Sequence, residues 1–519
     1  MSEVLDPTLL PILLVVVPLV AAAGILAIGR LFGATGIGLS LLATAVQAAM
    51  ALYLAGRTLL GGDGVRTTIA GFPAEEGGIE LFVDGVSALV VLLIAAVGVA
   101  VLVASVDERR SDSFYSLYVL LLAGLSGLAV TNDVFNMYVF LEISGLAAYA
   151  LIASDGTGSS ALAALKYLIV GTVGASLYLI GVGYAYVATG YLNMVQLAET
   201  LPEVGEFGYA DPQVQAAFGL IAAGFAIKIA LFPVHTWQPD AYTEAPDRMT
   251  ALIAALVSTT AAYALARVAL DVFTPAFFAA NPIVHDLVLA VAAASVIAGS
   301  VLAVLQSEVK RMFAYSSVSQ FGLVVVGIFL LNDTALVGAI VHLVGHAIVK
   351  AGLFLGVAGF AAAYGLRTVD DYAGLARRAP WASAAVAVLA LALVGIPPTV
   401  GFVGKLFVAI GAVEQDAWVL VAVIVASTVL TLGYVLRLLE RMYFTDPAPA
   451  SGESTAGADV AADGGASTDR QSQSGGSDGR IARPLLAVVI VAALASIGLG
   501  LLGAWFDAVL EPAVEVLLE

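Results

Sequence analysis

The sequence predicts an all-α polytopic membrane protein with about fourteen transmembrane helices, and three observations lead to that fold class. Hydrophobic residues make up 61% of the 519 residues and charged residues only 12%. The mean hydropathy is +1.01. Runs of about 20 apolar residues, long enough to span the ~30 Å hydrocarbon core, recur from end to end. Too few polar residues remain to cover a large soluble core, so that class of protein is excluded.

The positions of the arginines support the number of spans. When the loops are numbered alternately, most loop arginines fall in one set, which the positive-inside rule places in the cytoplasm. Both termini are then expected outside a cell membrane. The first segment has acidic flanks and no cleavage-site pattern, so we expect a retained helix and not a signal peptide. The spans are predicted at residues 8–29, 34–56, 82–105, 114–130, 133–153, 163–188, 213–235, 249–271, 284–305, 311–331, 334–363, 382–412, 417–443 and 484–507.

Two similar pentapeptides indicate an internal repeat. GFAIK (224–228) precedes Pro233, and GFVGK (401–405) follows Pro397–Pro398, so both lie in helices interrupted by proline. They are five predicted spans apart, and an odd offset reverses the direction of the second copy. Broken helices in inverted repeats typically mark an ion site near the middle of the membrane. We therefore expect two inverted five-helix repeats that contain broken helices.

The chain divides into five parts on this interpretation. The stretch 446–480 is rich in Gly, Ser, Asp and Ala and has no aromatic residue, which predicts a disordered cytoplasmic linker. The five parts are helices 1–3 (1–110), the first repeat (111–272), the second repeat (284–444), the linker (445–482), and the last helix with an outer tail (483–519).

Composition also limits the ligands of the chain. There is no cysteine, which excludes disulfides, thiolate-bound clusters and cysteine zinc sites. The formal net charge of −18 argues against a nucleic-acid partner. No segment is typical of a nucleotide, flavin or cluster site, so we expect no cofactor and no metal.

Lysines are few and unusually placed. Only five occur, and Lys166, Lys228, Lys350 and Lys405 lie inside hydrophobic segments, whereas Lys310 belongs to a predicted loop. A charge within a bilayer costs several kcal/mol, so such residues usually line an ion path. The sequence therefore points to movement of charge through the membrane.

Glu142 and Lys228 are the first candidate pair. Glu142 lies about ten residues into an apolar helix. It either bonds to a neighbouring helix in a purely structural role or pairs with Lys228. A carboxylate within ~4–6 Å keeps a lysine protonated, and weakening the pair releases the proton. We favour proton carriage by Lys228 over a static ion pair.

His342, His346 and Lys350 are spaced at i, i+4 and i+8. This spacing places three titratable groups along about 12 Å of one helical face. Water between them would make a proton path. Zinc binding by the two histidines is the alternative, but no acidic or cysteine ligand lies nearby in the sequence.

Three further residues complete the candidate set. Lys405 follows a proline break far from either membrane edge and is the expected carrier of the second repeat. His235, just after Pro233, either continues the path toward the cytoplasm or caps a helix at the interface. Lys166 lies near the cytoplasmic end of its helix, where its side chain can reach the interface, so we consider it an accessory residue.

The chain resembles the antiporter-like membrane subunits of Mrp-type sodium/proton antiporters and of the membrane arm of respiratory complex I. The matching segments are NDVFNMYVFLEISGLAAYAL, GFAIKIALFPVHTWQPDAYTEAP, EVKRMFAYSSVSQFG, VHLVGHAIVKAGLFLG and GIPPTVGFVGKLF, in the family's order over about residues 80–445. The NDVFNMYVFLEI segment is most similar to the D subunit of the Mrp complex.

The resemblance implies two half-channels joined by a polar axis at mid-membrane. Glu142 and Lys228 then match the acid–lysine pair, His342, His346 and Lys350 the central axis, and Lys405 the lysine of the second half-channel. One departure is Thr259, which replaces a lysine found in many complex I subunits, so other groups or water must bridge the half-channels here.

We therefore expect a proton-conducting subunit of a multisubunit sodium/proton antiporter, a secondary transporter and not an enzyme, with other membrane subunits as partners. The alternative is a proton-pumping subunit of a complex I-like dehydrogenase or membrane-bound hydrogenase, whose energy comes from a separate redox arm.

Overall fold

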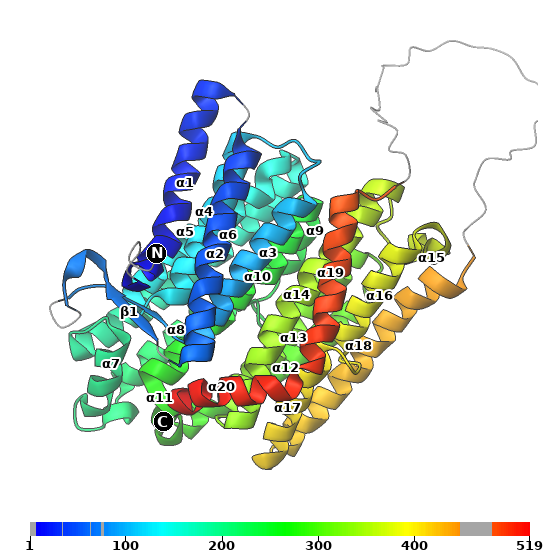
Figure 1. Cartoon of the computed structure of the whole chain (residues 1–519). Coiled ribbons are helices and arrows are strands. Elements are labelled where there is room, and N and C mark those ends of the chain that lie inside the picture. Colours follow the sequence, from blue (N-terminus) through cyan, green and yellow to red (C-terminus); the bar gives the residue numbers. More distant parts are fainter. Residues whose placement is uncertain (1–6, 34, 63, 74–76, 447–479, 519) are drawn as a thin grey trace, which may run out of the picture.

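The computed structural model describes residues 7–33, 35–62, 64–73, 77–446 and 480–518. Within these residues, thirteen helices are long and apolar enough to cross a membrane, which confirms the polytopic helical fold (Figure 1). Most of the linker predicted at 445–482 lies outside the described residues.

The long helices follow the apolar runs of the sequence closely. The predicted span 334–363, for example, is the helix Asp333–Tyr364. In chain order the long helices are α1 (Leu10–Phe32), α2 (Gly36–Gly61), α3 (Gly85–Ala104), α4 (Asp112–Val130), α5 (Val134–Ile152), α6 (Gly158–Thr189), α8 (Pro212–Ile229), α10 (Asp247–Arg267), α12 (Pro282–Val304), α13 (Val309–Phe329), α14 (Asp333–Tyr364), α18 (Trp418–Phe444) and α19 (Arg483–Leu501).

The remaining predicted span, 382–412, consists of two short helices. These are α16 (Pro380–Val394) and α17 (Val400–Glu414). The break has a local cause, because neither Pro397 nor Pro398 has an N–H to continue a helix. In the same way α8 ends at Ile229, shortly before Pro233, and the chain becomes helical again in α9 (Trp237–Glu244).

The two pentapeptides lie on opposite sides of their breaks. Lys228 belongs to the last turn of α8, before the break, whereas Lys405 lies in α17, after the break. Lys228 thus precedes its break in the chain, and Lys405 follows its break. Both breaks are present, and the inverted repeat itself stays a prediction.

Short elements cover the two ends of the helix bundle. One end, the α9 face, carries α9 and α15 (Leu375–Arg378). The opposite end, the α20 face, carries the antiparallel strands β1 (Val65–Thr68) and β2 (Glu80–Val83), with α7 (Met194–Thr200), α11 (Thr274–Ala280) and α20 (Gly503–Leu518).

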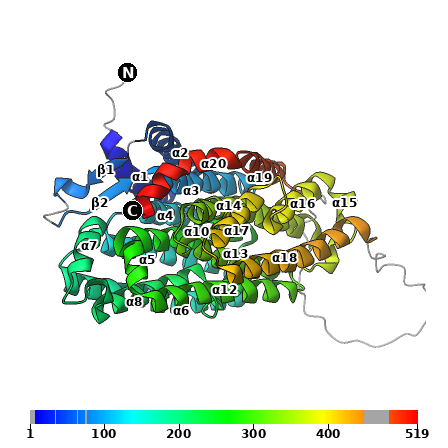
Figure 2. The same cartoon turned by 90° about the horizontal axis from the view of Figure 1, so that it is seen from below.

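Two of these elements depart from the sequence prediction. The β1–β2 hairpin is an addition to the all-α fold. The predicted outer tail is the helix α20, which lies across the ends of the spanning helices (Figures 1 and 2). Its buried residues Phe506, Leu510, Val514 and Leu517 recur every three or four positions, as expected for a helix lying on an apolar surface.

Gly401 allows α17 to lie directly against α16 at the second break. A Cβ atom on Gly401 would lie 1.9 Å from the carbonyl oxygen of Ala392. That contact is with backbone, which cannot move aside as a flexible side chain can. The geometry of the break therefore depends on the missing side chain.

We expect Gly401→Ala to lower the apparent melting temperature of the purified protein, because overpacking costs about 1–3 kcal/mol. The matched control is Gly38→Ala in α2, where nothing lies within 4 Å of an added Cβ. Alanine at this helical position should stabilise by about 0.5–1 kcal/mol. A Gly401→Ala protein that melts at or above the wild-type temperature would contradict this account of the break.

Candidate functional site

Lys228 forms a buried contact with two side chains of α5. Only 4% of Lys228 is exposed. Its Nζ lies 3.4 Å from Oε1 of Glu142 and 3.3 Å from the hydroxyl of Tyr149. The structure thus brings the predicted acid–lysine pair together.

The two members of this pair differ in exposure. The side chain of Lys228 is 5% exposed, whereas that of Glu142 is 22% exposed. The carboxylate is therefore open to an outside influence, and the ammonium group is not.

An aromatic wall fixes the position of Lys228. The Trp237 ring stacks on Tyr167 with centroids 3.8 Å apart, and Tyr167 meets the edge of Tyr149 at 4.4 Å. The indole N–H of Trp237 donates to the carbonyl of Ile227, 2.9 Å away, beside the lysine. Gly145 leaves room for the ammonium group, because a Cβ there would lie 3.1 Å from Nζ of Lys228.

A polar chain leads from Lys228 toward the second half of the molecule. Ser258 of α10 donates to the Lys228 carbonyl at 3.3 Å. The amide nitrogen of the buried Gln238 lies 3.4 Å from the Ser258 hydroxyl and 3.1 Å from that of Tyr242. Tyr242 then meets the edge of Phe354 at 5.9 Å, on α14.

The predicted stripe on α14 is present and fully buried. Lys350 donates from Nζ to the carbonyl of Phe313 and to the hydroxyl of Ser316, both at 2.6 Å. A ring nitrogen of His342 lies 2.9 Å from the amide oxygen of Gln320. The rings of His342 and His346 are 6.3 Å apart. The three titratable groups therefore share one helical face, as the spacing predicts.

Lys405 is held by the end of the broken helix. Its Nζ donates to the carbonyls of Leu393 and Val394, at 3.2 and 2.9 Å, in the last turn of α16. A helix C-terminus carries partial negative charge, which favours a cation there. Gly404 brings this lysine next to the stripe, since a Cβ on Gly404 would lie 2.6 Å from that of His342.

Among the described residues, neither Lys350 nor Lys405 forms an ion pair with a carboxylate. Carbonyl and hydroxyl oxygens replace the acid at both positions. Lys228 therefore differs from Lys350 and Lys405 in having an acidic partner.

Several buried polar atoms near these lysines lack a hydrogen-bond partner within the described part of the chain. Both ring nitrogens of His346 are among them, as is the hydroxyl of Thr259. Buried polar groups are nearly always paired, and buried water commonly provides the partner. The unpartnered Thr259 hydroxyl lies at the position where the sequence predicts that other groups or water are needed.

The accessory residues lie on the α9 face. The Lys166 side chain is 51% exposed, in keeping with the interfacial position predicted for it, and its Nζ lies 2.8 Å from Asp240 of α9. Asp240 also pairs with Arg311 of α13 at 2.9 Å. One carboxylate thus joins α6 and α13. His235 is buried between the rings of Phe232 and Tyr315.

Lys310 was expected in a loop, and this expectation was wrong. It lies in the first turn of α13, is 4% exposed, and pairs with Asp247 at 2.9 Å. The acidic partner comes from 63 residues earlier in the chain. A contact between residues so far apart in the chain cannot be predicted from local hydropathy.

Tyr149, Gln320 and Ser316 were not predicted as members of the site. Each is a polar residue on an apolar helix. Tyr149 lies seven positions after Glu142 on α5, and Gln320 and Ser316 lie on α13, where they contact His342 and Lys350 of α14. Polar residues within membrane helices are a usable signal, but serine and tyrosine are common there for packing reasons as well.

Comparison with known proteins identifies relatives of the same size. The family described as NADH:quinone oxidoreductase/Mrp antiporter, TM, matches residues 131–431. The N subunit of NADH-quinone oxidoreductase from Desulforudis audaxviator is 43% identical over 443 residues, which cover 84% of this chain and 86% of that protein. The D subunit of the Na(+)/H(+) antiporter from Bacillus subtilis is 33% identical over 379 residues, covering 72% and 75%.

A solved structure of the Mrp complex from Dietzia sp. DQ12-45-1b contains a chain with the same fold. The TM-score is 0.85 at 26% identity, and the match covers 100% of this chain and 98% of that chain. These findings confirm the resemblance drawn from the sequence motifs.

We expect Asp240→Asn to destabilise the protein by about 1 kcal/mol at neutral pH and low salt, since each exposed ion pair contributes up to about that amount. Burial raises the pKa of Asp240, but Lys166 and Arg311 outweigh it and hold the pKa below its usual value. The stabilisation is therefore present above the unfolded pKa of about 3.9 and lost as the pH falls through the lower folded pKa.

The measurement is the difference in melting temperature between wild type and Asp240→Asn. It should shrink in 1 M salt, where the screening length is about 3 Å. Asp286→Asn, at an exposed position of α12, is the control and should show no such difference. A difference that is equal at both salt concentrations would contradict the ion-pair explanation.

Proposed function

The chain belongs to the NADH:quinone oxidoreductase/Mrp antiporter transmembrane family, and from this premise we propose that it conducts protons as one membrane component of a multisubunit sodium/proton antiporter. Protons bind in turn to Lys228, to the His342–His346–Lys350 stripe and to Lys405. Inward proton flow through this chain drives sodium export by the assembled complex.

The observation that carries the proposal is the pair of Lys228 and Glu142, a buried ammonium beside a half-buried carboxylate. Removing the ammonium from water favours its neutral form, and the carboxylate favours its charged form. A small change at Glu142 therefore shifts the protonation of Lys228. Because Glu142 reaches the surface of the chain, a neighbouring subunit can make that change.

The rest of the path relays the proton through groups without acidic partners. Lys350 and Lys405 are bonded to carbonyl and hydroxyl oxygens, which accept hydrogen bonds from either form of a lysine. The unpaired nitrogens of His346 provide a site for water between them. Protonation of one lysine raises the cost of charging the next, so a proton moves on as another arrives.

A second candidate function is supported by the 43% identity to the N subunit of a NADH-quinone oxidoreductase. In that case the same buried groups pump protons, and a separate redox subunit provides the energy. The first candidate is supported by the near-complete structural match to a chain of an Mrp complex. In either case we place the chain in the cell membrane, with the α9 face toward the cytoplasm and both termini outside.

The two candidates differ in their response to sodium. Membrane vesicles containing the assembled antiporter should show sodium efflux driven by an imposed proton gradient alone. The redox alternative requires an electron donor before protons move. Proton translocation that starts only after addition of a reductant would replace the first candidate with the second.

We expect Lys228→Ala and Glu142→Ala to lower proton-coupled sodium efflux by about a hundredfold or more, as loss of an essential proton carrier does. Efflux is measured in vesicles with the complex assembled at wild-type levels. Lys166→Ala is the matched control, since its side chain is half exposed, and it should be much milder. Normal exchange in both Lys228→Ala and Glu142→Ala would reject the mechanism.

Lys228→Arg separates proton carriage from a static ion pair. Arginine keeps the positive charge beside Glu142 but does not release its proton in proteins. A fully assembled Lys228→Arg complex should therefore be as inactive as Lys228→Ala. Substantial efflux by Lys228→Arg would mean that the charge, and not its titration, is what transport needs.

A further inference from the structure

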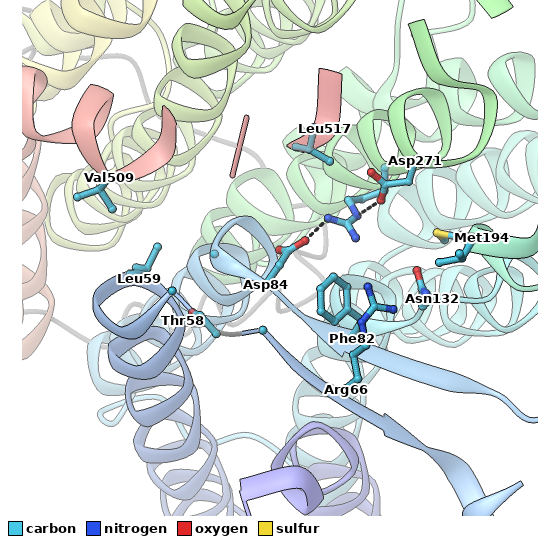
Figure 3. Close-up of a pocket in the computed structure, with 15 residues that line it drawn as sticks. Thr58, Leu59, Arg66, Phe82, Asp84, Asn132, Met194, Asp271, Val509 and Leu517 are labelled. Carbon is cyan, nitrogen blue, oxygen red and sulfur yellow. Dashed lines mark hydrogen bonds and ion pairs between the residues drawn. The ribbon is translucent and has the colours of Figure 1, made fainter. Parts of the chain in front are cut away.

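A polar chamber opens on the α20 face, away from the lysine path. Its volume is about 370 Å³, and the strand β2, α10 and α20 all contribute to its wall (Figure 3). Asp84, Arg66 and Asn132 line it together with Asp271. In Figure 3 the carboxylates of Asp84 and Asp271 lie on either side of one guanidinium group.

That guanidinium group belongs to Arg267, which is 8% exposed. It forms one ion pair with Asp84 and a second, from Nε, with Asp271 at 2.6 Å. Two carboxylates therefore share one buried cation, which leaves one negative charge in excess. Such an excess favours a proton or another small cation.

The same helix connects this cluster to the centre of the membrane. Thr259, Tyr263, Arg267 and Asp271 recur every four residues along α10 and its π-helical extension, Val268–Phe273. This spacing places them on one face. The Thr259 hydroxyl, at the inner end, is buried and has no partner among the described residues. The stripe therefore begins where water is needed and ends in the chamber.

A second, smaller cavity lies between the chamber and α14. Its volume is about 20 Å³, and its wall includes Tyr263 and Arg267 of α10 with Leu343 and Val344 of α14. These two α14 residues lie between His342 and His346 in the chain. Arg267 and Leu517 border both cavities. Arg267 and Leu517 thus separate the open polar chamber from a small space lined mainly by apolar side chains.

From this arrangement we propose that the chamber is where protons enter the conduction path from the α20 face, with Asp271 as the uptake group. A proton from water in the chamber binds the Asp271 carboxylate, forming the neutral acid. The acid then gives the proton by water along the α10 face toward Thr259, and the carboxylate returns. Arg267 keeps its ion pair with Asp84 throughout and prevents sodium from entering the small cavity.

Asp271 is assigned this role because the Asp84 carboxylate is already bonded to the backbone of α3 and to Arg267. Asp84 caps α3 by accepting from the backbone N–H of Ser87 at 2.8 Å. Burial raises the pKa of Asp84, but Arg267 and the bonds from Ser87 outweigh it and hold the pKa below its usual value. Arg66 and Glu80 pair with each other at the rim, 3.3 Å apart. Among the described residues Asp271 has its ion pair with Arg267 but none of the additional hydrogen bonds that Asp84 and Glu80 accept, so its carboxylate is the least committed of the three.

The proposal rests on the proposed proton conduction, but one test does not depend on transport. Because the chain has no native cysteine, single cysteines can be placed freely. Thr58 lines the chamber and Leu343 lines the small cavity. In vesicles with the complex assembled, Thr58→Cys should react with a charged, membrane-impermeant thiol reagent from the α20 face only, and Leu343→Cys should not react.

The transport test uses three carboxylate variants in the same vesicles. Asp271→Asn should lower proton translocation by about a hundredfold, because the amide neither accepts nor releases a proton. Asp271→Glu should retain most of the rate. Asp286→Asn, an exposed carboxylate at the same end of the bundle, should match wild type. If Asp271→Asn does not assemble, translocation is measured in Thr58→Cys before and after labelling, since a bulky charge in the chamber should block proton uptake.

Full translocation by Asp271→Asn, or by labelled Thr58→Cys, would overturn the uptake role. Reaction of Thr58→Cys from the α9 face, or no reaction at all, would overturn the chamber's opening. Either result combined with inactive Lys228→Ala would leave the conduction mechanism intact and move the uptake site elsewhere. Inactive wild-type vesicles with a reactive Thr58→Cys would instead reject conduction and keep the chamber.

Discussion

The cost of holding an ammonium group inside a membrane governs this structure. Four lysines are almost fully buried, Lys310 at the start of α13 and Lys228, Lys350 and Lys405 deeper in the bundle, and each needs oxygen atoms in place of water. Carbonyls inside an unbroken helix already accept a backbone hydrogen bond, so a cation there shares a carbonyl, as Lys350 shares that of Phe313. The break after α16 exposes two carbonyls to Lys405, and a carboxylate and a tyrosine hydroxyl from α5 serve Lys228. The break after α16 therefore solvates Lys405, whereas Lys228 and Lys350 take their oxygen partners from neighbouring unbroken helices.

Lys228, Lys350 and Lys405 are solvated in different ways. Under the proposed function, this difference decides which of them a group outside the chain can influence. Lys350 and Lys405 are bonded to fixed oxygens of the chain, whose field is constant. Lys228 depends on a carboxylate that is itself half buried at the protein surface. Under the proposed function, Glu142 is the point at which a neighbouring subunit changes the protonation of Lys228, whereas Lys350 and Lys405 respond to groups of this chain.

Much of this site was predictable, because hydropathy and proline mark helices and their ends locally. Glu142, Lys228, His342, His346, Lys350 and Lys405 all stand out as charged or titratable residues within apolar runs. The ion pairs at the two faces were not predictable. Lys166 meets Asp240 across 74 positions and Arg267 meets Asp84 across 183, so only the packing of helices brings them together. For the same reason α20 looked like a tail, since its apolar stripe is short and its partner surface is formed by distant helices.

Paired and unpaired groups occupy different parts of the bundle. Ion pairs such as Asp240–Lys166 and Asp84–Arg267 lie toward the ends, whereas the middle holds the pair Lys228–Glu142 and groups that have no acidic partner among the described residues. Pairs at the ends fix the helices relative to one another, because breaking one costs stability without moving a proton. Unpaired groups in the middle are costly for stability and are retained where the interior must exchange protons with water. Under the proposed function, the ion pairs near the two ends keep the bundle rigid, and the titratable groups between them form the proton path.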